Sequence, residues 1–290
     1  MSFEIFTDSA SNLGGGLARE HNIQVISLPY FLDGKEQPLL DADTFDAADY
    51  YGKLKAGAVV TTSQINPQRY MEILTPCLQA GKDILFVGMA GGISGSYASA
   101  RIAAEELMHD FPGRKVRTVD SLGASLGEGL LVLEAAECRE KGMGLEQTAA
   151  YLETRRMQMY QIFIADDLRH LHRTGRISNA SAIIGSVLGI RPLLKGSAEG
   201  TIVAFGKIRG KRQAIRAMAE KFIALGRETD RIGISNCACP EDVEFLIQLL
   251  EPHIPRDHIL CVNHEPATGS HLGPGSLALF FYGDEDVRQF

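Results

Sequence analysis

Ser94 and Ser96 stand in a glycine-rich segment, residues 88–96, that could bind an anion. The segment follows an apolar run at residues 84–87, and apolar residues at helical spacing continue from it to Phe111. The first N–H groups of a helix have no partner inside the helix, and the helix dipole favours negative charge beside them. The pattern predicts a phosphate or carboxylate site at Ser94. The alternative is a tight turn with Ser96 as the helix N-cap.

Polar side chains also follow three other predicted strands, in residues 8–9, 61–63 and 120–121. Strands alternate with helical patterns through the first half of the chain, which predicts a parallel sheet with helices on both faces. Ligands of such sheets bind beyond the carboxyl ends of the strands. We therefore expect these hydroxyl and carboxylate groups to lie at the same edge as Ser94.

His271 precedes a Gly-Pro-Gly turn at residues 273–275. We expect this histidine to lie in a loop, where the backbone and not a helix face sets its position. An imidazole can donate a hydrogen bond or a positive charge to an anion. The alternative interpretation is an ordinary surface histidine.

A Gly-x-Ser-x-Gly pattern surrounds Ser125, as in the nucleophile elbow of serine hydrolases. The elbow places its serine directly after a strand, whereas the predicted strand here ends near Val119. The plain interpretation of Ser125 is a helix N-cap. A hydrolase acting on lipid esters, with Ser125 or Ser94 and His271, stays open as an alternative function.

Nucleotide and metal sites have less support. No Walker-type phosphate loop and no dinucleotide-binding glycine motif follows a strand. His170 and His172, with Asp166 and Asp167, match no familiar metal-ligand spacing, so we interpret them as solvated helix residues. We expect neither a cofactor nor a metal.

The second half of the chain follows a different pattern. A predicted hairpin joins residues 191–194 and 201–205, and further helices and strands follow. We predict a fold of α/β class with two domains: an N-terminal parallel-sheet domain at residues 1–157 and a C-terminal mixed α/β domain at residues 158–290. Residues 178–194 are almost uncharged, which is typical of a buried core or of the wall of an apolar cavity.

Composition excludes several classes of protein. A net charge of −7 argues against a general nucleic-acid binder, and no apolar run approaches the roughly 20 residues of a membrane span. The five cysteines include no Cys-x-x-Cys pair, and the N-terminal residues resemble no leader peptide. We therefore predict a reduced, cytoplasmic location.

One local run reverses the acidic balance. Five basic residues and no acidic residue occur between positions 207 and 216. The run is either a solvated helix face or a docking surface for an acidic partner. Arg209 is the candidate docking residue, because it precedes Gly210 at a predicted strand-to-helix corner. The basic residues are Lys207, Arg209, Lys211, Arg212 and Arg216.

Seven segments, in order and over nearly the full length, resemble motifs of the DegV family of bacterial fatty acid-binding proteins. They lie at residues 7–9, 62–64, 93–97, 120–121, 167–177, 189–192 and 271–275. The resemblance implies a two-domain α/β protein with a long-chain fatty acid between its domains. It implies that the carboxylate binds to Thr62, Ser94 and His271, with Ser63 and Gly95 in the same motifs.

The resemblance also implies a partner. Such proteins present the fatty acid to an ATP-dependent fatty acid kinase, which makes an acyl phosphate, and they catalyse no reaction themselves. Arg209 falls where the family has a partner-docking arginine. The chain departs from the family pattern at Ile65 and Asn66, at Ala90 and Gly91, and at Thr174.

The chemistry of a fatty acid fits these residues. A carboxylate accepts hydrogen bonds only, and hydroxyl, backbone N–H and imidazole groups can donate them. Burying about 14 methylene groups at ~0.8 kcal/mol each would contribute roughly 11 kcal/mol before ordering costs. The predicted ligand therefore needs only a few polar contacts. A regulator that senses acyl chains would use the same contacts and stays open as a third function.

Overall fold

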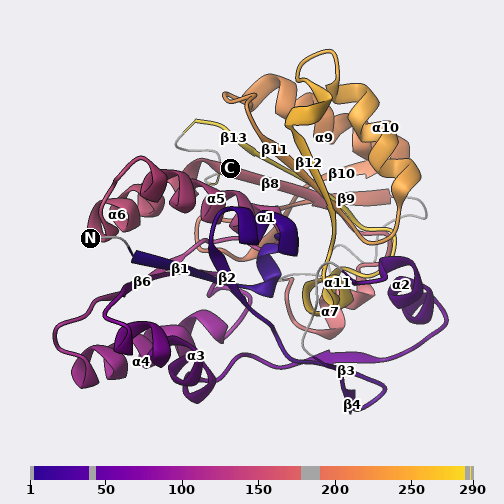
Figure 1. The fold of residues 1–290 in the computed structure, drawn as a ribbon. Coiled ribbons are helices and arrows are strands. Elements are labelled where there is room, and N and C mark those ends of the chain that lie inside the picture. Colours follow the sequence, from indigo (N-terminus) through magenta and orange to yellow (C-terminus); the bar gives the residue numbers. More distant parts are fainter. Residues whose placement is uncertain (1–2, 39–43, 178–189, 285–287, 289–290) are drawn as a thin grey trace.

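The computed structural model describes residues 3–38, 44–177, 190–284 and 288. Two sheets, with helices around them, organise the molecule (Figure 1). The uncharged segment singled out in the sequence falls mostly within residues 178–189, which lie outside the described residues.

The N-terminal sheet is parallel throughout. Its strand order is β2-β1-β6-β7, and Phe6 of β1 pairs with Gln24 of β2 and Phe86 of β6. Its two inner strands, β1 and β6, are buried along almost their whole length because helices cover both faces. The strands are β1 (Phe3–Asp8), β2 (Ile23–Ile26), β6 (Asp83–Gly88) and β7 (Val116–Asp120).

Alternate side chains of these strands enter two different cores. Phe6 and Phe86 pack with α3 and α4 on one face, whereas Ile5 and Leu85 face a core that contains α5 and α6. Short α1 lies beside β2. Helix α6 follows α5 after Gly142 and was missed by the sequence analysis. The helices are α1 (Gly15–Glu20), α3 (Pro67–Gln79), α4 (Ser96–Asp110), α5 (Leu126–Glu140) and α6 (Leu145–Arg155).

The C-terminal sheet is mixed, with strand order β10-β9-β8-β13-β11-β12. The predicted hairpin is confirmed as the antiparallel pair β9 and β10. Helices α9 and α10 pack on one face of this sheet. The elements are β8 (Met159–Ile164), β9 (Ile190–Gly196), β10 (Ile202–Arg209), α9 (Lys211–Leu225), β11 (Ile232–Asn236), α10 (Pro240–Leu250), β12 (Ile259–Asn263) and β13 (Leu277–Tyr282).

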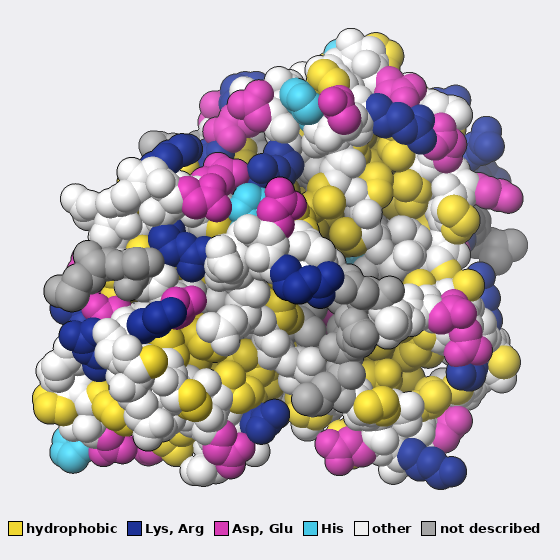
Figure 2. All heavy atoms as spheres, viewed as in Figure 1, with side chains coloured by type: hydrophobic (Ala, Val, Ile, Leu, Met, Phe, Trp, Pro, Cys, Tyr) yellow, Lys and Arg dark blue, Asp and Glu magenta, His cyan; other side chains and the backbone are white. Residues whose placement is uncertain are grey.

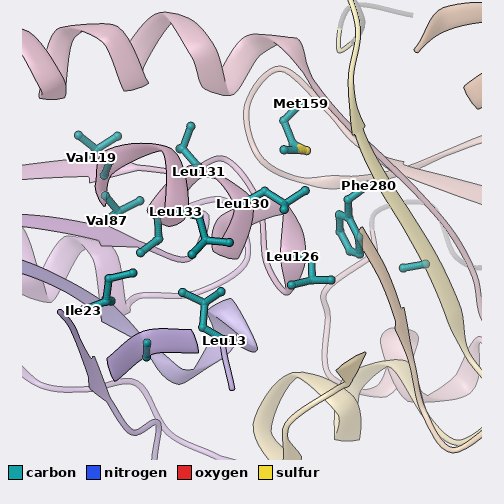
Figure 3. Close-up of a cluster of buried hydrophobic side chains, with 14 of the residues drawn as sticks. Leu13, Ile23, Val87, Val119, Leu126, Leu130, Leu131, Leu133, Met159 and Phe280 are labelled. Atoms are coloured by element: carbon teal, nitrogen blue, oxygen red, sulfur yellow. The ribbon is translucent and has the colours of Figure 1, made fainter. Parts of the chain in front are cut away.

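Helix α5 lies between the two sheets. Leu131 and Leu133 lie near Val119 of the parallel sheet, while Leu126 lies toward Phe280 of the mixed sheet (Figure 3). The helix is buried on almost every side, so one apolar core joins both halves of the chain. The predicted fold class, a parallel sheet followed by a mixed α/β unit, is confirmed.

A third, three-stranded sheet corrects two expectations. The apolar run at residues 23–31 favours one strand by its sequence, but it forms two, because β2 ends at Ile26 and β3 belongs to this small sheet. Strand β5, which carries Thr62, also belongs to it and not to the parallel sheet. The elements of this region are β3 (Tyr30–Leu32), β4 (Lys35–Glu36), α2 (Ala47–Lys55) and β5 (Val60–Thr62).

The remaining elements are short. They include α7 (Arg169–Arg173), α11 (Pro266–Leu272) and the 3-10 turns η1 (Ser9–Ser11), η2 (Arg156–Gln158) and η3 (Arg256–His258). Within the described ranges, none of the helices has the length and apolar character needed to cross a bilayer. Acidic and basic side chains are interspersed over the face shown in Figure 2. The division of the chain at residue 157 stays a prediction, although the mixed sheet begins at Met159.

Candidate functional site

A cavity lies between the loops at the carboxyl edge of the parallel sheet and one face of the mixed sheet. It encloses about 1070 Å³ of empty space, counted out to the solvent at its mouth. One end is lined by hydroxyl, amide, guanidinium and imidazole groups. Apolar side chains line much of the rest, among them Met89, Phe163, Leu272, Ala278 and Phe280. All five predicted ligand-binding residues line the cavity: Thr62, Ser63, Ser94, Gly95 and His271.

Thr62 and His271 meet at the polar end. Thr62 Oγ1 and His271 Nε2 share a hydrogen bond of 3.0 Å across 209 residues of sequence. Thr62 ends β5, and His271 belongs to α11. The small sheet of the N-terminal half therefore reaches over the C-terminal half and closes this end of the cavity.

His271 does not lie in a loop, so that expectation is wrong. It occupies the last turn of α11, because Glu265 caps the helix and Pro266 begins it. The Glu265 carboxylate accepts hydrogen bonds from Ala267 N at 2.7 Å and Thr268 N at 2.5 Å. The Gly-Pro-Gly turn follows the helix and ends it, since Gly273 has a φ of 81°.

Two tyrosines of α2 hold α11 in place. Tyr50 Oη donates to Pro266 O and Tyr51 Oη donates to His264 O, both at 2.8 Å. Both tyrosine side chains are buried, and their rings meet edge to face. The position of His271 thus depends on contacts between distant parts of the chain.

The imidazole of His271 is neutral near pH 7. Burial and, to a smaller extent, the positive charges of Arg176 and Arg173 lower its pKa to about 4. Its Nδ1 atom is buried, and no group in the described part of the chain bonds to it. His271 can therefore offer a hydrogen bond to an anion at neutral pH, but not a positive charge.

The glycine-rich turn places Ser94 at the start of α4. The N-cap is Gly95, so the expectation that Ser96 caps the helix is wrong. Ser94 Oγ accepts a hydrogen bond from Ser96 N at 3.2 Å, and the hydroxyl of Ser96 is turned inward to accept from Ile65 N at 3.2 Å. Ser94 is thus the hydroxyl of this turn that lines the cavity.

Gly95 lies against the end of the Gln64 side chain. A Cβ atom at this position would lie 1.9 Å from Oε1 of Gln64. Gln64 also lines the cavity, and its Nε2 donates to Ser99 Oγ at 3.2 Å. The sequence analysis treated Gln64 only as part of a motif and missed its place in the wall.

The carboxylates at the strand ends do not line the cavity among the described residues. Asp8 accepts hydrogen bonds from Ala10 N and Met89 N, at 2.9 and 3.1 Å. Asp120 accepts from Gly91 N at 3.1 Å and from Leu122 N at 2.8 Å. These carboxylates fix the loops that carry the hydroxyls, and burial raises the pKa of Asp8 to about 6. The carboxylates thus lie at the same edge as Ser94, as expected, but they bond to the loops and do not line the cavity.

Arg176 supplies the full positive charge among the described lining residues, and the sequence analysis missed it. Its Nε donates to Ile93 O at 3.2 Å, in the turn that precedes Ser94. It lowers the pKa of His271, which places its charge near the imidazole. The sequence feature that could have identified Arg176 is its position in residues 174–176, directly after the glycine that follows α7.

Ser125 has no base beside it. Its backbone is strained, with φ 55° and ψ −141°, and it lines the cavity. Its Oγ accepts a hydrogen bond from Asn12 Nδ2 at 3.0 Å. His271 bonds Thr62, and His264 bonds Ser235 at 2.8 Å. In the described part of the chain, neither Ser94 nor Ser125 bonds to a histidine, and Ser125 occupies the N-cap position without a side-chain capping bond.

The basic run divides into one internal cation and four exposed ones. Lys211 Nζ contacts Asp166 Oδ2 at 3.0 Å and Asp242 Oδ2 at 2.7 Å, so Lys211 does not belong to a docking surface. Arg209 is exposed, and it ends β10 directly before the α9 N-cap Gly210, as predicted. The other exposed cations are Lys207, Arg212 and Arg216.

The two carboxylates at residues 166–167 form ion pairs and precede α7, so they are not solvated helix residues as expected. Asp166 pairs with Lys211, and Asp167 pairs with Arg169 at 2.8 Å. Across the ranges that the structure describes, no group of three or more histidine, cysteine or acidic residues is arranged to hold a metal ion.

Comparison with known proteins adds a family and a fold. The family model described as "Uncharacterised protein, DegV family" matches residues 2–284. A DegV domain-containing protein of Clostridium perfringens is 34% identical over 286 residues, which are 97% of this chain and 98% of that protein. These matches span nearly the whole chain and include every residue assigned above to the polar end.

Two solved structures share the fold. A DegV family protein from Thermus thermophilus, described by its fatty acid binding, is 31% identical with a TM-score of 0.87, over 98% of this chain and 100% of that one. The Fatty Acid Kinase (Fak) B3 protein of Streptococcus pneumoniae, solved with linoleic acid, is 21% identical with a TM-score of 0.82, over 98% of this chain and 100% of that one. At that identity, the second likeness shows the fold alone.

Proposed function

The chain belongs to the DegV family, and we propose that it is a carrier that binds a long-chain fatty acid in the cavity between its two sheets. The observation that carries the proposal is the shape of that cavity: a cluster of hydrogen-bond donors at one end and an apolar wall behind it. A fatty acid has the same division, with one charged end and a long apolar chain. The fatty acid binding described for the T. thermophilus relative supports this ligand class.

In this proposal the carboxylate binds at the polar end. The hydroxyls of Thr62 and Ser94 donate hydrogen bonds to its two oxygens. His271 Nε2 donates to Thr62 Oγ1 and so leaves the Thr62 proton free for the ligand, and Ser63 and Gly95 shape the same surface. Hydrogen bonds to a charged acceptor are stronger than neutral ones. Arg176 neutralises the negative charge, so burying the carboxylate does not leave an unpaired charge.

The acyl chain supplies most of the affinity. Each methylene group transferred from water to an apolar wall contributes about 0.8 kcal/mol. Phe163, Ala278 and Phe280 form part of that wall on the mixed sheet, and Met89 and Leu272 flank it. The polar end then fixes the orientation of the ligand.

The test is to identify what the purified protein carries. Denaturation, solvent extraction and mass spectrometry should yield a long-chain fatty acid. A ligand that binds only the folded state raises its stability, so the loaded protein should melt at a higher temperature than the stripped protein. An empty extract, together with no thermal response to added fatty acids, would contradict the proposal.

We further propose that this carrier presents its ligand to a separate fatty acid kinase in the cytoplasm. The kinase would transfer the γ-phosphoryl group of ATP to a carboxylate oxygen, giving an acyl phosphate and ADP. In this proposal the carrier needs no catalytic group of its own for this step.

The exposed cations suit an acidic partner surface. The guanidinium groups of Arg212 and Arg216 lie 4.7 and 5.1 Å from the ring centre of Phe245, which holds both on one surface. Arg209 lies just before the same helix, and in the described structure no carboxylate pairs with it. Acyl-phosphate formation by a fatty acid kinase, with the loaded protein compared against free fatty acid, tests the presentation step.

A further inference from the structure

A polar side chain, Gln161, lines the cavity away from its polar end. Strand β8 begins at Met159 and ends near the polar end of the cavity. Helix α7 follows β8 at that end, and helix α11 precedes β13 there. Ile164 pairs with Leu277 at that end, and Gln161 pairs with Phe280 three residues further along the sheet. At about 3.3 Å per residue, Gln161 lies roughly 10 Å deeper than this first pair.

Gln161 faces the cavity together with Phe163. Side chains two residues apart point to the same face of a strand. Both residues line the cavity, whereas Tyr160, Ile162 and Ile164 pack on the opposite face with α9 and α10. An acyl chain that runs from the polar end along this face passes Phe163 before it meets Gln161.

Three glycines surround the amide of Gln161. A Cβ atom at Gly127 would lie 2.6 Å from its Cδ and Oε1, and one at Gly123 would lie 2.6 Å from its Nε2. A Cβ atom at Gly196 would lie 3.5 Å from the same Nε2. The amide therefore fills a space in which three neighbouring positions carry no side chain.

Hydrogen bonds fix this amide in place. Gln161 Nε2 donates to Leu122 O at 3.3 Å, and the same carbonyl accepts from Arg288 Nη1 at 2.6 Å. Arg288 is only 3% exposed, and its Nη1 also donates to Ser197 O at 3.3 Å. A longer acyl chain would have to displace an amide that is backed by a buried guanidinium group, and the displaced polar groups would lose their partners.

We propose that Gln161 determines the longest acyl chain that the cavity accepts. This inference rests on the proposed fatty acid function and names the residue that limits the ligand. Chains that end before Gln161 gain affinity with each methylene group. A chain that reaches the amide gains nothing more, because its terminal methyl group meets a fixed polar surface.

The experiment measures the dissociation constants of a series of saturated fatty acids for the stripped protein and its variants. In the wild type, affinity should rise about fourfold per methylene group and then stop rising. In Gln161→Ala the rise should continue past the wild-type limit, again by about fourfold for the first added methylene group. Shorter acids should bind both proteins equally.

Matched variants separate length from polarity. Gln161→Met keeps a long side chain but loses the hydrogen-bonded amide, so its limit should lie between those of the wild type and Gln161→Ala. Adding Gly127→Ala to Gln161→Ala returns a methyl group to the vacated space and should shift the limit back toward shorter acids. Gln213→Ala, on the exposed side of α9, should leave the whole profile unchanged.

The outcomes are distinguishable. An unchanged chain-length profile in Gln161→Ala, with fatty acid binding intact, would overturn the role of Gln161 and leave the carrier function in place. A limit in Gln161→Met that equals the limit in Gln161→Ala would also overturn the steric role. Failure of the wild type to bind any acid of the series would instead contradict the proposed function itself.

Discussion

The two ends of the cavity are built in different ways. The polar end joins segments that are far apart in the sequence: Thr62 from the small sheet, Ser94 from the glycine-rich turn and His271 from α11. The far end depends on one regular element, the face of the mixed sheet that carries Phe163 and Phe280. The comparison indicates that a few hydrogen-bond donors at the polar end fix the orientation of the ligand. The sheet face supplies most of the affinity, because it buries apolar surface of the acyl chain.

The largest expected effect comes from shortening the ligand and leaving the protein unchanged. Removing six methylene groups from a fatty acid should weaken binding by about 5 kcal/mol, on the order of a thousandfold or more. Isothermal titration with two acids that differ by six carbons measures the change. A loss of less than tenfold would mean that the polar end, and not the apolar wall, supplies the affinity.

Arg176→Ala should have the next largest effect. It removes the positive charge near the bound carboxylate and should weaken binding by about 1.5–3 kcal/mol, roughly 10- to 150-fold. Arg173→Ala is the matched control, because Arg173 is exposed and does not line the cavity. If both variants lost the same affinity, the overall positive charge near the site would matter, and a direct contact between Arg176 and the carboxylate would not.

Thr62→Val tests a single donor. The substitution keeps the shape of the side chain and removes the hydroxyl, and affinity should fall by about 1–3 kcal/mol. Thr61→Val is its control, because Thr61 precedes it on the same strand and is exposed. If the control weakened binding as much as Thr62→Val, the hydroxyl of Thr62 would not be a ligand-binding group.

The buried imidazole of His271 should make stability depend on pH. Its folded pKa of about 4 lies below its usual value of 6.5, so the stabilising contribution is present above pH 6.5 and is lost as pH falls toward 4. The loss should reach up to about 1.4 kcal/mol per pH unit. Urea unfolding of the stripped protein between pH 7 and 4.5 should therefore show a shallower decline in His271→Gln than in the wild type. Parallel declines would contradict the buried neutral state.

Arg209→Glu should have the smallest effect on the cavity. Arg209 is exposed and does not line the cavity, so fatty acid affinity and melting temperature should stay nearly unchanged. Acyl-phosphate formation with a fatty acid kinase should nevertheless fall sharply, and the wild-type rate should weaken with added salt, which screens exposed charges over about 8–10 Å. Unchanged coupling at both low and high salt would show that the exposed cations are only a solvated surface.

Local pattern was sufficient for much of this fold. The alternation of apolar strands and helices predicted the parallel sheet, and the glycine-rich turn predicted a helix start beside Ser94, because both depend on neighbours within a few residues. The β9–β10 hairpin and the strand-to-helix corner at Arg209 followed from the same kind of signal. Residue types alone also indicated an anionic ligand, either a phosphate or a carboxylate, because hydroxyl, backbone N–H and imidazole groups can all donate hydrogen bonds.

Only the tertiary structure decided which of these groups meet. Thr62 and His271 are 209 residues apart, and their contact depends on two tyrosines of α2 that bond the backbone beside α11. The same kind of long-range packing makes Lys211 an internal ion-pair partner and turns Gln161 toward three glycines. Such positions follow from the burial of side chains against distant segments, and no local periodicity carries that information.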